Sequence, residues 1–151
     1  MIAYDMTAWR IDSEGGYEQV SPARQQEISH AQARLALGLL DAARPFHPGS
    51  ADLWTERAHI ELNRLGDLPA AAASYRRAWE QPNGPYFAAR LHGEVLRRMG
   101  RKADALAWWV TLHPRLPPQL DGAAAPLVLS RIRDLEAELK VPLARAYRPP
   151  P

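Results

Sequence analysis

The sequence predicts an all-α protein built as a short stack of antiparallel helix pairs. Two helix–turn–helix stretches between residues 52 and 114 superimpose at an offset of 34 residues, the step from Gly66 to Gly100. The other matched pairs are Leu62 with Leu96, Leu65 with Met99, Ala71 with Ala105, Tyr75 with Trp109, Ala78 with Leu112, and Pro48 with Pro82. A fixed period of this size is typical of stacked helical repeats. Proline and glycine also stand at the expected helix ends.

The composition is that of an ordinary soluble protein and excludes several function classes. The chain has 151 residues, of which 46% are hydrophobic and 24% charged, and both shares are typical of globular domains. The net charge of +2 is too small to indicate nucleic-acid binding by itself. Because the sequence contains no cysteine, disulfides, thiol catalysis and sulfur-ligated metal are excluded.

No segment of the sequence predicts membrane insertion or export. No apolar run approaches the roughly 18 residues that a membrane span requires. Residues 1–6 have neither the basic nor the apolar segment of a signal peptide. If the chain is complete, we therefore expect a cytoplasmic protein, with the periplasm as the alternative.

Residues 1–21 form an N-terminal arm that differs from the rest of the chain. Two short alternating runs, residues 8–12 and 17–20, flank a turn that contains glycine. This pattern allows a β-hairpin, which would have to lie against the helices because an isolated hairpin is marginally stable. The alternative is an irregular arm in which Trp9 and Tyr17 cover apolar surface.

The helical domain spans residues 22–140 and begins with a leading helix over 22–44. Ser21 is a good N-cap, and Pro22 suits the first helical position. Pro45 ends this helix, because proline cannot continue one. Apolar residues recur near helical spacing at Ile28, Leu35, Leu39 and Leu40.

Two helix pairs follow, a first repeat over residues 52–81 and a second over 86–113. Gly66 and Gly100 interrupt the pairs, since glycine tolerates the left-handed backbone of a helix end. Small side chains are expected where backbones approach, at Ala58, Ala71, Ala78, Gly93 and Ala105. Bulky side chains are expected to fill the remaining space, at Leu62, Tyr75, Leu96 and Trp109.

Trp108 and Trp109 are adjacent and cannot share one environment. On a helix their side chains point about 100° apart, so Trp109 can be buried while Trp108 points elsewhere. Trp108 then either forms a partner surface or is covered by the N-terminal arm or the final helix.

The final helix, residues 126–140, is expected to close the open end of the stack. One face is apolar, with Val128, Ile132, Leu135 and Leu139 at steps of 4, 3 and 4. The other face is charged, with Arg131, Arg133, Asp134, Glu136 and Glu138. An amphipathic helix of this kind can cap a stack of repeats. The tail, residues 141–151, is rich in proline and is expected to be extended, with polyproline II geometry as one form.

The repeated residues resemble the tetratricopeptide repeat family, well over residues 52–114 and more weakly over 33–48. The resemblance depends on Gly66, Asp67, Ala71, Ala105, Tyr75, Trp109 and Pro82. Three positions depart from the family pattern: Trp54 is shifted by one residue, His92 replaces a leucine, and Leu112 replaces an alanine. The resemblance implies a right-handed α-solenoid that acts as a protein-binding scaffold or adaptor, without catalytic residues or cofactor.

The resemblance also places the first helix of each pair on a concave, partner-binding surface. The residues expected there are Leu53, Glu56, Ile60, Asn63, Arg64, Phe87, Arg90, Glu94, Arg97 and Arg98. Steps of 4 and 3 place Arg90, Glu94 and Arg97 on one helix face. Clustered guanidinium groups can receive carboxylates, which favours a protein or peptide partner with an acidic segment or a chain terminus. The alternative interpretation is a solvated charged face.

No pattern in the sequence indicates catalysis or metal binding. The five histidines, His30, His47, His59, His92 and His113, do not form a metal-site motif. Near the packing seam, His59 and His92 are expected to be hydrogen-bonded structural residues. Ser74 and Ser130 have no base in a recognised arrangement, and the carboxylates lie mostly beside arginines, which suggests surface ion pairs.

The sequence leaves three hypotheses for the function. The first is a protein-interaction scaffold, the second an accessory subunit or soluble domain of a larger bacterial membrane-associated or envelope assembly, and the third an enzyme. Arginine pairs interleaved with acids argue against nucleic acid as a partner. Because so few repeats leave open ends, a homodimer or a heterocomplex is plausible.

Overall fold

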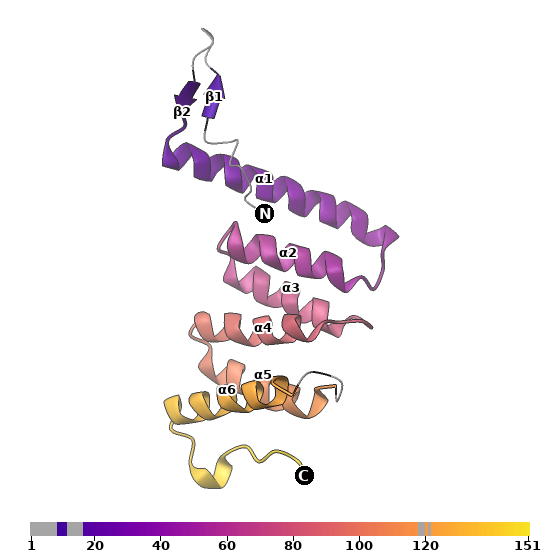
Figure 1. Cartoon of the computed structure of the whole chain (residues 1–151), viewed down its shortest axis with the longest axis vertical. Helices are drawn as coiled ribbons and strands as arrows, with labels where there is room; N and C mark the ends of the chain where they lie inside the picture. Colours follow the sequence, from indigo (N-terminus) through magenta and orange to yellow (C-terminus); the bar gives the residue numbers. More distant parts are fainter. Residues whose placement is uncertain (1–8, 12–16, 118–119, 121) are drawn as a thin grey trace.

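The computed structural model describes residues 9–11, 17–117, 120 and 122–151, and these confirm the all-α class. Figure 1 shows the helices stacked in sequence order along the long axis, with a pair of short strands at one end and the C-terminus at the other. The helices are α1 (Pro22–Ala43), α2 (Ala51–Asn63), α3 (Leu68–Glu80), α4 (Tyr86–Arg98), α5 (Lys102–Leu112) and α6 (Ala124–Glu138). Three 3₁₀ turns, η1 (Arg44–Phe46), η2 (His113–Arg115) and η3 (Leu143–Arg145), join or follow them.

The described part of the N-terminal arm is a two-stranded antiparallel pair. Strands β1 (Trp9–Ile11) and β2 (Tyr17–Gln19) pair with Arg10 opposite Glu18. These residues adopt the hairpin alternative. The turn between the strands, the side chains of Trp9 and Tyr17 and the apolar surface they were expected to cover lie outside the described part of the arm.

Helix α1 begins as its capping residues require but buries little of its own surface. The Ser21 hydroxyl accepts a hydrogen bond from the Arg24 backbone N–H at 3.3 Å, and Pro22 is the first helical residue. Ala33 is the buried residue of α1, whereas Leu35 and Leu39 are 68% and 64% exposed. Two of the four recurring apolar positions are therefore exposed, and they form an apolar stripe on α1, whereas Ile28 and Leu40 are half-buried.

Helices α2 and α3 form a closely packed antiparallel pair. Gly66 has a φ of 64°, a left-handed conformation that glycine adopts at low cost. The Asp67 carboxylate then caps α3 by accepting from the Ala70 N–H at 3.1 Å. Ala71 and Tyr75 of α3 are fully buried. Burial raises the pKa of Tyr75 to about 12, with a smaller contribution from the charge of Glu56, because ionisation in the core is unfavourable.

Helices α4 and α5 repeat this design around a larger side chain. Gly100 has a φ of 77° at the matching break, and Trp109 is fully buried. A methyl group at Gly93 would lie only 2.5 Å from the Trp109 ring, so glycine is what lets α4 approach this indole. The predicted buried role of Trp109 and the small residue at position 93 are confirmed.

Helix α6 buries the expected stripe only in part. Val128, Ile132 and Leu135 are fully buried in the same core as Trp109. Leu139 was predicted in this stripe, but it ends the helix and is 38% exposed. The prediction was wrong because the chain turns away at Lys140, whose φ is 54°.

The C-terminal tail folds back onto α5 and α6. The Tyr147 backbone N–H donates to the Glu136 carboxylate at 2.5 Å, and the Tyr147 hydroxyl lies 3.1 Å from Nδ1 of His113. Glu136 was predicted on a solvated face, and this was wrong, because the tail leaves the residue only 7% exposed. Burial alone would raise the pKa of Glu136, but the bonds from Tyr147 and Arg133 and the Arg133 charge lower it overall.

None of the helices in the described ranges is long and apolar enough to cross a bilayer.

Candidate functional site

The ten residues predicted to bind a partner all lie on α2 and α4 or on the residue that ends α2. They occupy matching positions of the two pairs: Leu53 and Phe87, Glu56 and Arg90, Ile60 and Glu94, Asn63 and Arg97, and Arg64 and Arg98. Phe87 also reaches α2, because its ring stacks on that of His59 with centroids 6.3 Å apart. We call the surface made by these ten residues the first-helix face.

Helix α6 pairs with two of the predicted residues. Arg131 Nε donates to the Glu94 carboxylate at 2.6 Å. Arg97 pairs with Glu138, which also receives Lys102 at 2.9 Å. The bond from Lys102, followed by the bond and charge of Arg97, lowers the pKa of Glu138. Arg97 is thus engaged within the protein, which removes it from the guanidinium cluster that we expected to receive a carboxylate.

A third predicted residue, Arg64, forms a hydrogen bond with α1. Arg64 Nε donates to the Ser29 hydroxyl at 3.1 Å, across a sequence separation of 35 residues. The helix spacing within 52–114 could not show this bond, because the direction of α1 across α2 depends on tertiary packing.

The middle of the first-helix face keeps its polar groups available. Arg90, Arg98 and Glu56 form no ion pair with any described residue. Phe87 is 39% exposed although it stacks on His59. Because Phe87 and Arg90 are three residues apart on α4, they present an aromatic ring and an unpaired guanidinium side by side.

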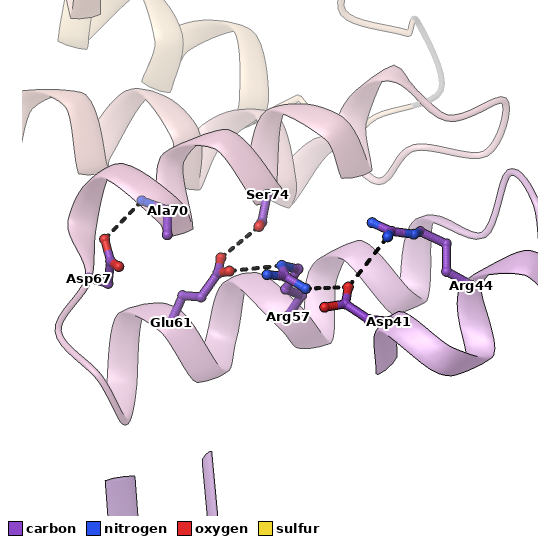
Figure 2. Close-up of polar contacts among 7 residues, drawn as sticks. All are labelled: Asp41, Arg44, Arg57, Glu61, Asp67, Ala70 and Ser74. Carbon is purple, nitrogen blue, oxygen red and sulfur yellow. Dashed lines mark hydrogen bonds and ion pairs between the residues drawn. The ribbon is translucent and has the colours of Figure 1, made fainter. Parts of the chain in front are cut away.

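A polar network ties α1, α2 and α3 together (Figure 2). The Ser74 hydroxyl donates to Glu61 at 2.6 Å, and Glu61 pairs with Arg57 at 2.8 Å. Arg57 also pairs with Asp41 at 2.5 Å, and Asp41 lies 3.5 Å from Arg44. These residues line a cavity of about 340 Å³, which we call the α1–α3 cavity.

The carboxylate at the centre of this network is buried rather than on the surface. Glu61 is 3% exposed, which contradicts our expectation that the carboxylates form surface pairs. The burial is tolerated because both carboxylate oxygens have partners. Burial would lower the pKa of Arg57, but the bond to Asp41 and the charges of Glu61 and Asp41 outweigh it and raise the pKa. Arg44 and Arg77 also cover the Trp54 ring, at 5.0 and 4.8 Å.

A second cavity, of about 410 Å³, is lined by residues of α3, α4 and α5 and by Arg115 of η2. We call it the α3–α5 cavity; it is lined by Arg76, Trp79, Glu80, His92, Leu96, Arg101, Asp104, Ala107, Trp108, Thr111 and Arg115. His92 Nδ1 lies 2.7 Å from the Ala72 carbonyl, which confirms His92 as a hydrogen-bonded structural histidine. His59 differs, because its described contacts are with the rings of Tyr75 and Phe87.

Trp108 is covered by α4. Its Nε1 donates to the Ala89 carbonyl at 2.8 Å, and its ring meets His92 edge-on at 4.3 Å. We expected the N-terminal arm or the final helix to cover Trp108, but the contacts come from α4, the preceding helix of the stack. The residues of this cavity could not be predicted as a group, because they come from three helices and η2.

The described residues contain no group of three or more histidine or carboxylate side chains that could hold a metal ion. No protein-family model matches this chain, and comparisons with curated proteins and with solved structures find no match.

Proposed function

We propose that this chain is a short right-handed solenoid of tetratricopeptide-like helix pairs whose first-helix face binds a segment of a partner protein. The main support is the exposed Phe87 beside the unpaired Arg90. A ring that can cover an apolar side chain next to a guanidinium that can receive a carboxylate suits a peptide with both groups.

The paired glycines and aromatics support the repeat architecture. Gly66 and Gly100 share the left-handed conformation at the same break. Tyr75 and Trp109 are fully buried at the same position of the second helix. A structural period that matches the sequence period is what a repeat protein requires.

The ion pairs with α6 limit where a peptide would bind. Glu94 and Arg97 are neutralised by Arg131 and Glu138, so this end of the face attracts ions weakly. The N-terminal half of α4 remains, with Phe87, Arg90 and the neighbouring Leu53 and Glu56 of α2. We therefore assign the acidic group of the partner to Arg90 rather than to Arg97.

Selection from a displayed random-peptide library tests this assignment. We expect peptides with an acidic residue close to an apolar one, and a loss of affinity of at least about tenfold in Arg90→Glu, where a charge-assisted bond becomes a repulsion. Arg145→Glu is the control, because Arg145 is exposed in η3 and the net charge changes equally. Equal losses in both variants, or selected peptides without acidic residues, would contradict the proposal.

The exposed stripe of α1 favours a second candidate, a permanent subunit of a larger complex. Leu35, Leu39 and Phe46 are 68%, 64% and 80% exposed, and exposed apolar patches often mark interfaces. Light scattering of the purified protein checks the homodimer form of this candidate. A dimer that dissociates in a Leu35→Lys, Leu39→Lys variant supports it.

A further inference from the structure

The α3–α5 cavity contains a buried imidazole whose second nitrogen is unused. A carbonyl oxygen can only accept, so His92 Nδ1 must carry the proton of its 2.7 Å bond to Ala72. Burial, assisted by the charges of Arg76 and Arg101, lowers the pKa of His92 in spite of that bond. The ring is therefore neutral at pH 7, and Nε2 is an acceptor without a partner among the described residues.

The rim of the same cavity carries a cation that none of the described acids neutralises. Arg115 lies over the Trp79 ring at 5.7 Å and forms no ion pair with any described residue. The other two arginines are occupied, Arg76 by Glu80 and Arg101 by Asp104. Arg115 can therefore bind an anion without breaking an existing pair.

The walls between rim and floor are apolar and aromatic. Trp79, Trp108, Leu96 and Ala107 line them, and the Trp79 Nε1 is buried without a hydrogen-bond partner. A cavity of about 410 Å³ is at the small end of ligand sites, so it accommodates one large residue rather than a long segment. His92 is 7% exposed and marks the floor, whereas Arg115 is exposed and marks the rim.

We propose that the α3–α5 cavity binds a C-terminal tyrosine of a partner polypeptide. The terminal carboxylate pairs with Arg115, the ring lies against Trp79 and Trp108, and the phenol donates to His92 Nε2. A terminal residue places the carboxylate and the side chain on one Cα, which fits the small cavity. Tyrosine places its hydroxyl at the far end of the ring, so that one residue extends from the rim to the floor. This site is separate from the first-helix face and does not depend on its function.

Three peptides test the proposal: Gly-Ser-Gly-Ser-Tyr with a free C-terminus, its C-terminal amide, and the counterpart that ends in phenylalanine. Amide NMR titrations of the full chain report where each one binds. We expect saturable shifts of the Trp79 and Trp108 indole signals with the first peptide, and about tenfold weaker binding of each of the others, the effect of one lost bond to a charged or buried group.

Repeat-related positions supply matched variants. Ala107 and Ala73 are both exposed and line the two cavities 34 residues apart, so Ala107→Leu should reduce binding while Ala73→Leu should not. Arg115 and Arg77 each cover a tryptophan ring, so Arg115→Gln should abolish the preference for the free carboxylate while Arg77→Gln preserves it. Equal affinities for the three peptides, or an unchanged carboxylate preference in Arg115→Gln, would overturn the proposal.

Discussion

The α1–α3 and α3–α5 cavities occupy equivalent places in consecutive repeats but are built from opposite chemistry. On the second helix of each pair, Ala70, Ala73, Ser74 and Arg77 become Asp104, Ala107, Trp108 and Thr111 at an offset of 34 residues. The wall of the first cavity holds a chain of ion pairs that runs from Asp41 through Arg57 to Glu61. The second holds the neutral imidazole of His92 and the guanidinium of Arg115, which lies over the Trp79 ring and has no ion-pair partner among the described residues.

Differences in side-chain size at matched positions explain how the same helix arrangement forms both cavities. Position 59 has a histidine against Tyr75, whereas the matching position 93 has a glycine against the larger Trp109. Similarly, Ser74 leaves room for the Glu61 carboxylate, whereas Trp108 fills that space in the next repeat. The repeat thus keeps its helix positions while the side chains at matched positions differ in size and polarity, and the polar groups determine what each cavity can bind.

The largest expected effect is the loss of the ionic centre of the first cavity. Glu61→Ala leaves the buried Ser74 hydroxyl without its acceptor and Arg57 with Asp41 alone. We expect a loss of about 2–4 kcal/mol of unfolding free energy, less than for a fully buried pair because Arg57 is 24% exposed. Urea denaturation followed by circular dichroism measures it. Glu80→Ala removes the exposed pair with Arg76 and should cost no more than about 1 kcal/mol. Similar losses in both variants would show that the network contributes no more than a surface pair.

A smaller effect is expected at the glycine that admits Trp109. Gly93→Ala places a methyl group 2.5 Å from the indole, and we expect a loss of about 1–3 kcal/mol through overpacking. Gly38→Ala is the control, because no atom lies within 4 Å of the added methyl group. That substitution should stabilise α1 by roughly 0.5–1 kcal/mol. A stabilising Gly93→Ala would mean that α4 and α5 can separate freely.

Local sequence signals predicted the helices, and tertiary contacts explain what they missed. Ser21, Pro22, Gly66 and Gly100 act through a few neighbouring residues, so their roles could be inferred from the sequence. The final helix begins at Ala124 rather than Pro126, an ordinary boundary difference.

The candidate site was less predictable than the helices. The ten residues of the first-helix face could be grouped by helix period, but the pairing of Arg97 with Glu138 and of Arg64 with Ser29 depends on how α6 and α1 cross their neighbours. The burial of Glu136 similarly depends on a tail that folds back without any regular pattern. Both cavities join residues from three helices, and no single period connects them.

The smallest effect that we predict is a pH dependence centred on His92 in the second cavity. Its pKa in the folded protein lies below the ordinary value of 6.5 because the ring is buried. The unfolded chain therefore binds a proton more readily, and stability that is present above pH 6.5 is lost as the pH falls below it. His92→Asn retains an N–H for the Ala72 carbonyl but does not titrate. Between pH 7 and 5, we expect the unfolding free energy of the wild type to fall more steeply than that of this variant. Parallel curves would place the acid sensitivity at another residue. Because the protonated Nε2 of His92 can no longer accept a hydrogen bond from a phenol, we also expect tyrosine-ended peptides to bind more weakly as the pH falls over this range.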